Sequence, residues 1–256
     1  LNSWGQLGTS NQTNYSSPVQ VGTGSLWTSV ACGYNFTTAI QTAGSLWVWG
    51  NNSWGQLGTN NQTNLSSPVQ IAGTWNQVSC GYFHTGAITA GSLYMWGNNS
   101  YGQLGQGNNT HYSSPLQVLT STNNWSNLGN AGAYHTIALQ TNGTLWAWGL
   151  NTYGQLGTNN QTNYSSPVQI GTSSTWTTIS SGSYFNMAIQ TPGTLWAWGI
   201  NSYGQLGQNN QTNYSSPVQV GSLSTWTAVA CGYSHTVALQ TPGTLWAWGN
   251  NSSGQL

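Results

Sequence analysis

Histidine and cysteine are the side chains of this sequence best suited to metal binding or nucleophilic chemistry, and they recur at matched points. His84, His135 and His235 share one position of a repeated pattern, and Cys80 and Cys231 lie four residues before two of them. Imidazole and thiolate groups are the usual ligands of zinc, so a ring of them would be a candidate metal site.

Two repeats have phenylalanine, Phe36 and Phe185, where the others have histidine, and the residues around that position do not change with it. We therefore predict packed structural histidines, no metal site and no cofactor. Three equivalent cysteines, Cys32, Cys80 and Cys231, do not make a disulfide framework. No acidic residue is present to complete a Cys-His-acid set, so the chain is predicted not to be an enzyme.

The 256 residues include no Lys, Arg, Asp or Glu, whereas an ordinary chain of this length carries roughly 64 charged residues. Without Lys and Arg the chain cannot neutralise phosphates, which argues against nucleic acid and charged membrane surfaces as partners. Without Asp and Glu it lacks Ca²⁺ and Mg²⁺ ligands and the paired acids of glycosidases. Because carboxylates dominate acid denaturation, their absence predicts a melting temperature that is nearly flat from about pH 2 to 5.

The matched positions belong to one unit that is repeated along the chain. Trp-Gly steps begin at Trp49, Trp96, Trp148, Trp198 and Trp248, which are 47, 52, 50 and 50 residues apart. A fixed period of this length is typical of solenoids and propellers. We interpret residues 1–256 as a single domain of five repeats, and an excerpt of a longer repeat protein remains an open alternative.

Four short strands are predicted in each period. A run headed by proline, such as Pro167–Ile170, is followed by a run centred on Trp, such as Trp176–Ser180. Two alternating runs then follow, which in the last repeat are Thr236–Gln240 and Thr244–Trp248. Four strands with period-two alternation and turns between them form one antiparallel sheet, and a sheet every 50 residues or so predicts an all-β fold, a β-propeller of four-stranded blades.

The phase of the repeats predicts how the ring closes. The N-terminal edge strand, Pro18–Val21, has no partner before it, and the last three strands, residues 226–248, lack a fourth. Pairing these elements would complete a fifth blade and remove two open edges. Residues 1–7 and 250–256 would then compete for one place, which a longer parent chain would also explain.

The last repeat also carries the motifs of a known family. Val229-Ala-Cys-Gly-Tyr-Ser-His-Thr-Val-Ala-Leu239 precedes Gly243-Thr-Leu-Trp-Ala-Trp-Gly249 and a Gly-x-Asn-x-x-Gly-Gln-Leu element. Over its whole length the chain resembles the regulator of chromosome condensation repeat family. The resemblance implies a propeller, usually of seven blades, and five periods depart from that number.

The activity of the founding members does not follow from this resemblance. It implies guanine-nucleotide exchange on a small GTPase and chromatin binding through charged segments, and no charged residue here matches those segments. We therefore predict neither activity. Some secreted bacterial members resemble inhibitors that clamp a partner protein with an aromatic-rich face, and this precedent suits the composition better.

Loop aromatics are the predicted binding residues, because loops carry function more often than scaffold positions and Tyr and Trp among Asn, Ser and Gly suit adaptable recognition. The members of one set come directly before Gly-Gln, and the members of the other come directly before Ser-Ser-Pro. The alternative to binding is that these side chains pack each loop against its blade. The first set is Trp4, Trp54, Tyr101, Tyr153 and Tyr203, and the second is Tyr15, Tyr112, Tyr164 and Tyr214.

Asparagine-rich loops also contain Asn-x-Ser/Thr acceptors for glycosylation. The clearest candidates are Asn61, Asn64, Asn160, Asn163, Asn210 and Asn213. Together with the missing charges, these sites predict an extracellular location or the surface of a cell or virion.

The sequence thus predicts a non-enzymatic structural, adhesion or protein-interaction module that works through neutral aromatic and amide loops. Its partner is a protein, either another protein or a second copy in a homo-oligomer or filament. A glycan-binding propeller and a secreted protein-binding inhibitor are the two alternatives.

Overall fold

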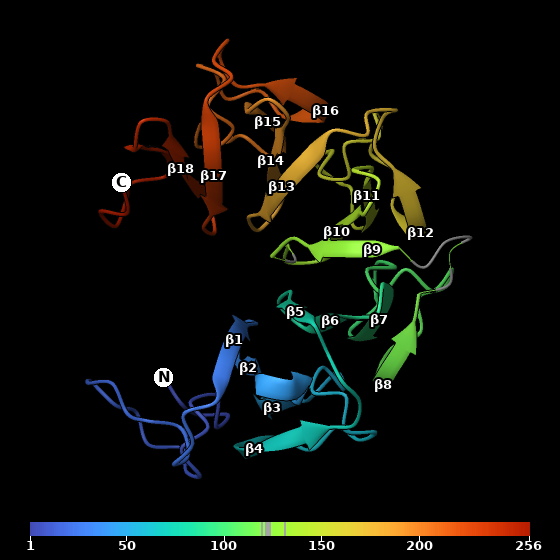
Figure 1. The fold of residues 1–256 in the computed structure, drawn as a ribbon, viewed down its shortest axis with the longest axis vertical. Helices are drawn as coiled ribbons and strands as arrows, with labels where there is room; N and C mark the ends of the chain where they lie inside the picture. Colours follow the sequence, from blue (N-terminus) through green and yellow to red (C-terminus); the bar gives the residue numbers. More distant parts are fainter. Residues whose placement is uncertain (119, 121–123, 131) are drawn as a thin grey trace.

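The computed structural model describes residues 1–118, 120, 124–130 and 132–256, and folds them into five antiparallel sheets set side by side in an arc (Figure 1). Each sheet is one blade of a β-propeller, which confirms the predicted fold class. None of the described residues forms an α-helix, so this part of the chain has no helix able to cross a membrane.

The strands follow one another with the same spacing in every blade. Blade 1 contains β1 (Trp27–Cys32), β2 (Phe36–Gln41), the 3-10 turn η1 (Thr42–Gly44), β3 (Leu46–Gly50) and β4 (Leu65–Ile71). Blade 2 contains β5 (Gln77–Cys80), β6 (His84–Thr89), β7 (Ser92–Gly97) and β8 (Tyr112–Gln117). Blade 3 contains β9 (Trp125–Leu128), β10 (His135–Gln140), β11 (Leu145–Gly149) and β12 (Tyr164–Gln169). Blade 4 contains β13 (Trp176–Ser181), β14 (Phe185–Gln190), β15 (Thr194–Gly199) and β16 (Tyr214–Gln219), and blade 5 contains β17 (Trp226–Cys231), β18 (His235–Gln240) and β19 (Thr244–Gly249).

Each complete blade takes its fourth strand from the following repeat. In blade 4, β15 pairs with β14 on one side and with β16 on the other, and Gly199 lies opposite Tyr214. The predicted start of the fourth strand at proline is wrong by three residues, because β12 begins at Tyr164 and contains Pro167 in its interior. The first strands of the blades lie toward the inside of the arc and the fourth strands lie outside (Figure 1). This arrangement places around the centre the glycines that lie between the first and second strands. We call them the glycine steps, and they are Gly33, Gly81, Gly132, Gly182 and Gly232.

The Trp-Gly step needs glycine because the chain turns sharply away from the blade there. Gly149 has a φ of 104°, and a Cβ atom on it would lie 2.6 Å from the carbonyl oxygen of Tyr134. A side chain at this position would therefore be strained and would also clash with the backbone. The repeat of this geometry in every blade explains the Trp-Gly spacing.

Tryptophans pack with aliphatic side chains in the apolar core between blades. In blade 3, the Trp125 ring meets Trp146 and Trp148 edge to face, with centroids 6.1 and 5.8 Å apart. Trp148 is fully buried and its Nε1 donates to the carbonyl of Gln103 in the preceding loop at 2.9 Å. Four buried clusters of this kind join neighbouring blades.

The two ends of the arc are not joined. Blade 5 has three strands, and the predicted strand at Pro18–Val21 does not form, because β19 is not beside it to provide hydrogen bonds. The end faces are exposed as a result: Leu245 of blade 5 is 67% exposed, whereas its counterpart Leu195 is fully buried. The predicted closure is therefore not formed in this structure, and it stays a prediction.

Candidate binding face

A chain of backbone hydrogen bonds runs from blade to blade around the centre. The links are Tyr34 N to Tyr82 O (3.2 Å), Tyr82 N to Ala133 O (3.3 Å), Ala133 N to Ser183 O (3.0 Å) and Ser183 N to Tyr233 O (3.2 Å). Each linking residue follows the glycine step that ends the first strand of its blade. We call this chain the central ladder; it fixes five turns relative to one another without using any side chain.

Five tyrosines project from the ladder or from the residue next to it. Tyr34, Tyr82 and Tyr233 are ladder residues of blades 1, 2 and 5, whereas Tyr134 and Tyr184 come one residue later in blades 3 and 4. We call these five residues the central tyrosines. They are 5.3 to 6.3 Å apart, centroid to centroid, in the pairs Tyr34–Tyr82, Tyr82–Tyr134, Tyr134–Tyr184 and Tyr82–Tyr233.

Tyr82 connects blades that are not neighbours. Its hydroxyl is 3.2 Å from the Ser183 hydroxyl of blade 4, and its ring stacks on Tyr233 of blade 5 at 6.3 Å. Burial raises the pKa of Tyr82 to about 12, the Ser183 hydrogen bond opposes this rise, and the neighbouring Tyr233 adds to it. Burial likewise raises the pKa of Tyr134 and of Tyr184. These three phenols therefore stay neutral at physiological pH and act as hydrogen-bonding groups.

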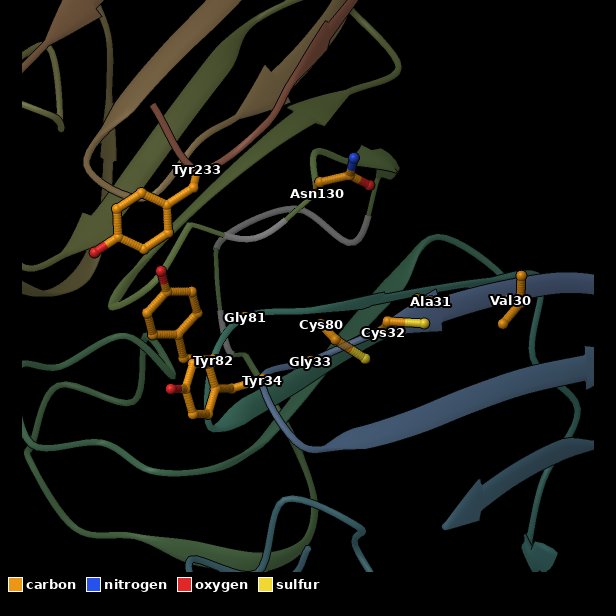
Figure 2. Close-up of a pocket in the computed structure, with 10 residues that line it drawn as sticks. All are labelled: Val30, Ala31, Cys32, Gly33, Tyr34, Cys80, Gly81, Tyr82, Asn130 and Tyr233. Carbon is orange, nitrogen blue, oxygen red and sulfur yellow. The ribbon is translucent and has the colours of Figure 1, made fainter. Parts of the chain in front are cut away.

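A cavity of about 550 Å³ opens beside the central tyrosines. Figure 2 shows the ring of Tyr82 between those of Tyr34 and Tyr233, with the amide of Asn130 across the opening and Cys80 in its wall. Its lining offers aromatic faces, hydroxyls and an amide but no charge. The lining side chains can therefore stack on a neutral ring of a ligand and form hydrogen bonds with the substituents of that ring.

Two members of the first set of predicted loop aromatics lie next to these tyrosines. Tyr101 meets Tyr134 edge to face at 5.4 Å, and Tyr153 meets Tyr184 at 5.6 Å. The backbone N–H of every member donates to the glutamine two residues later, so repeat symmetry gives Trp4, Trp54 and Tyr203 the same position in their own loops. All five are 38 to 54% exposed. Tyr101 and Tyr153 form one aromatic face with the central tyrosines. Trp54 instead meets the ring of His111 at 4.9 Å.

The second predicted set has a different position. The hydroxyl of Tyr164 accepts a hydrogen bond from Asn160 Nδ2 at 3.0 Å, and its ring packs on a core cluster. Tyr112 and Tyr214 make equivalent contacts, and Tyr15 makes the same hydrogen bond with Asn11. This geometry favours the alternative that these tyrosines pack the loop against the blade, so the first set is the better candidate for binding.

The loops that present the aromatic face are organised by buried asparagines. Asn151 is fully buried, and its Nδ2 donates to the carbonyls of Asn160 and Thr162, both at 3.0 Å. Its Oδ1 accepts from the N–H of Leu156 at 2.8 Å. Asn2, Asn52, Asn99 and Asn201 make equivalent bonds, which makes each loop a rigid support.

The predicted glycosylation sites fall in the same loops. Asn64, Asn163 and Asn213 are exposed and use Oδ1 to accept from the buried asparagine backbone, whereas Asn160 and Asn210 donate Nδ2 to tyrosine hydroxyls. Asn61 is exposed and donates Nδ2 to the carbonyl of Thr59. Because a glycan is attached at Nδ2, Asn64, Asn163 and Asn213 suit modification best, and glycosylation stays a prediction.

His84 and His135 pack in the core, as predicted. Both are fully buried; His84 Nε2 lies 3.2 Å from the Thr136 hydroxyl, and His135 Nε2 lies 2.9 Å from Asn186 Oδ1. Burial lowers the pKa of His84 to about 3, with His135 lowering it further, and burial lowers the pKa of His135 to about 4 against the effect of Asn186. Among the described residues, no three histidines or cysteines are grouped as metal ligands.

The cysteines do not supply a reactive thiolate at this face. Burial raises the pKa of Cys80 and of Cys231 to about 12, so both are neutral thiols near pH 7. All three cysteines are free, and Cys32 is exposed at the open end of blade 1. The described site thus favours binding over covalent chemistry.

Sequence reasoning missed the central tyrosines. The signal was present, because Gly33-Tyr34, Gly81-Tyr82 and Gly232-Tyr233 repeat one dipeptide at the glycine step. In blades 3 and 4 the tyrosine is displaced by one residue, which hides the pattern in an alignment of repeats. The convergence of these residues is a property of the arc and becomes visible only in three dimensions.

Comparison with family models gives matches to the regulator of chromosome condensation (RCC1) repeat over residues 1–40, 43–88, 90–139, 142–189 and 192–239. A second model of the same repeat matches residues 27–56, 75–103, 176–205 and 226–255. Together the matches cover nearly the whole chain.

Solved structures show the same fold. The chain is similar to human WBSCR16, with 25% identity and a TM-score of 0.83 over 98% of this chain and 70% of that one. It is also similar to Prp20p from Saccharomyces cerevisiae, with 23% identity and a TM-score of 0.78 over 88% of this chain and 57% of that one. The crystal structure of Kap60 bound to yeast RCC1 (Prp20) gives 23% identity and a TM-score of 0.77, and this chain spans 56% of the matched length.

Proposed function

Because the chain belongs to the regulator of chromosome condensation (RCC1) repeat family, we propose that residues 1–256 act as one propeller domain that binds another protein without catalysis. The observation that carries this proposal is the aromatic face, where central tyrosines held by a backbone ladder adjoin exposed loop aromatics. Aromatic side chains on a rigid support bury large areas at little entropic cost, and Tyr and Trp dominate binding hot spots.

The absence of charged residues limits the kind of contact surface that a partner can have. A buried unpaired charge is costly at an interface, and this face has no group that could pair one. We therefore propose a partner whose contact surface is neutral, rich in apolar, hydroxyl and amide groups. The yeast relative has described binding properties to Gsp1p and histones, and another structure shows it bound to Kap60; this supports protein binding as the general role. Histone binding and nucleotide exchange are not part of the proposal.

We place the domain outside the cell, as a structural, adhesion or inhibitor module. Exposed asparagines at Asn64, Asn163 and Asn213 and a fully neutral surface support this location. Localisation of a tagged chain in its native host tests it; retention in the cytosol would contradict it.

Removing two central tyrosines is expected to weaken partner binding at least tenfold. Tyr134→Ala with Tyr184→Ala deletes two stacked rings and the supports of Tyr101 and Tyr153, and single hot-spot tyrosines contribute about 2 kcal/mol. The partner is first trapped by a photo-crosslinking residue at Tyr203, and then affinity is measured by calorimetry with the purified partner. Leu116→Ala, on the outer strand β8, is the matched control and should change nothing; equal affinity of both variants would contradict the proposal.

A glycan is the second candidate ligand, favoured by one specific observation. The cavity in Figure 2 combines the faces of Tyr34, Tyr82 and Tyr233 with the Asn130 amide, which is a suitable set for stacking on a sugar ring and bonding its hydroxyls. Competition by neutral oligosaccharides would distinguish this function. If the Asn130→Ala variant no longer shows competition by oligosaccharides, the sugar binds in the cavity. If the unmodified chain shows no such competition, the cavity is not a sugar site.

A further inference from the structure

A groove lies between blades 1 and 2, beside the outer strand β4 (Figure 1). Its volume is about 580 Å³, within the range of small-molecule sites. On the side of blade 1 it is lined by Thr59, Val69 and Gln70, and on the side of blade 2 by Trp75 and Tyr94. The rings of Trp75 and Tyr94 meet edge to face, with centroids 5.4 Å apart. The groove therefore combines aromatic surface with neutral polar groups.

The same groove recurs between blades 3 and 4. Its volume is about 530 Å³, and Thr158, Trp176 and Trp196 take the positions of the threonine, the tryptophan and the tyrosine of the first groove. The two aromatic rings are again edge to face, at 6.1 Å. Both grooves lie between complete four-stranded blades, away from the ends of the arc. We call these two sites the threonine grooves.

In the other two blade interfaces a glutamine replaces this threonine. Between blades 2 and 3, Gln106 Nε2 donates to the carbonyls of Leu116 and Gln117, at 3.2 and 3.3 Å. Between blades 4 and 5, Gln208 Nε2 donates to the carbonyl of Gln219 at 3.1 Å. The glutamine amide thus lies against the stretch of the fourth strand that lines each threonine groove. The chain itself shows what this stretch accepts, which is a neutral hydrogen-bond donor on an apolar stem.

We propose that each threonine groove binds a neutral sugar. Hydroxyl or acetamido N–H groups of the sugar donate to the backbone carbonyls that the glutamines use in the other interfaces, and the sugar ring packs on the aromatic side chains. A few polar groups that orient a ligand over aromatic surface are typical of small-molecule sites.

Two observations select this class of ligand. The chain has no charged side chain, so an acidic or basic ligand would be buried without a counter-charge. The volumes of both grooves exceed what one carboxamide side chain needs, which favours a ring-sized ligand over a glutamine of a partner protein. Two equivalent sites on one chain allow bivalent attachment to a surface that carries glycans. The threonine grooves are separate from the aromatic face and from the cavity in Figure 2, so this proposal does not depend on the proposed function.

Calorimetric titration of the 256-residue chain with four disaccharides tests the proposal: N,N′-diacetylchitobiose, cellobiose, maltose and lactose. At least one of them should bind, with two molecules per chain. Thr59→Gln with Thr158→Gln should weaken this binding by about tenfold or more, because the new amides take the carbonyls that the sugar needs. Either substitution alone should leave one site. The double variant should stay folded, because the chain already has glutamine at this position in the other two interfaces.

Thr63→Gln with Thr162→Gln is the matched control. Both threonines are exposed in the same loops but do not line the grooves, so binding should not change. The indole resonances of Trp75 and Trp176 should shift on titration of the unmodified chain and should not shift in the Thr59/Thr158 variant. Failure of all four sugars to bind, or binding that the Thr59/Thr158 variant retains unchanged, would overturn the proposal.

Discussion

Replacing His84 and His135 together by phenylalanine is expected to remove most of the loss of stability that the protein undergoes between about pH 6.5 and 3. Both imidazoles are buried and held neutral, with pKa values lowered from 6.5 to about 3 and 4. Phenylalanine suits the position, because Phe36 and Phe185 occupy it in blades 1 and 4 and pack on the same glycine step.

The direction follows from proton linkage. Well above pH 6.5 the two histidines are neutral in both states, so their environment imposes no pH-dependent penalty. As pH falls, the unfolded chain binds protons that the folded chain does not, and stability is lost until the folded pKa values are reached. At 1.36 kcal/mol per pKa unit, each histidine accounts for about 3 to 5 kcal/mol at the acid limit, and their proximity makes the two effects non-additive.

Urea unfolding at several pH values between 7 and 3 measures this effect. The unfolding free energy of the unmodified chain should decline through this window, and that of the double variant should stay nearly constant. His235→Phe is the comparison variant, because it makes the same substitution at the same repeat position in blade 5. Parallel curves for the unmodified chain and the double variant would contradict this account.

This expectation corrects the inference drawn from composition alone. The absence of carboxylates predicted a melting temperature nearly flat from about pH 2 to 5. The chain has no carboxylates whose protonation could cause acid denaturation. Its buried histidines, however, make the fold sensitive to acid in another way. Stability should still be falling at pH 5 and should level off only near pH 3.

A second large effect is expected from Asn151→Asp, which should destabilise the fold by about 3 to 5 kcal/mol at pH 7. The change keeps the shape but replaces the amide that donates to the carbonyls of Asn160 and Thr162. A buried carboxylate there would face two acceptors and no cation, and an uncompensated buried charge carries a penalty of this size. The pKa of the new carboxyl should be raised, so the penalty should shrink as the pH falls.

Asn251→Asp is the matched control, because Asn251 holds the same repeat position but is exposed. Its substitution should change stability by no more than about 0.5 kcal/mol. Thermal and urea unfolding of both variants at pH 7 and pH 4 measures the difference. Equal, small effects would mean that Asn151 does not organise its loop.

The elements that depend on local pattern were predictable from the sequence. Alternation and Trp-Gly spacing placed the strand run Trp176–Ser180 within one residue of β13 (Trp176–Ser181), and the matching runs of the other blades followed from the repeat. The structural explanation is also local, because Gly149 is required by a positive φ and a close carbonyl.

The features that depend on distance between repeats were not predictable. Pro18–Val21 has the sequence of a strand but no partner beside it, and a strand exists only where its ladder can form. The contact between the Tyr82 and Ser183 hydroxyls joins blades 2 and 4, and the shared repeat position of these residues does not reveal that two non-neighbouring blades meet at the centre. The lowered pKa values of His84 and His135 depend on how fully neighbouring blades bury each ring.

The central ladder has an evolutionary consequence. Its links are made by backbone atoms, so the amino acid at each link can change while the link itself persists: Tyr34, Tyr82, Ala133, Ser183 and Tyr233 all serve. Blades 3 and 4 carry a small residue at the link and move the tyrosine one place along. Duplicated repeats can therefore differ in recognition one blade at a time, while the fold continues to depend on glycines, tryptophans and asparagines such as Gly149, Trp148 and Asn151.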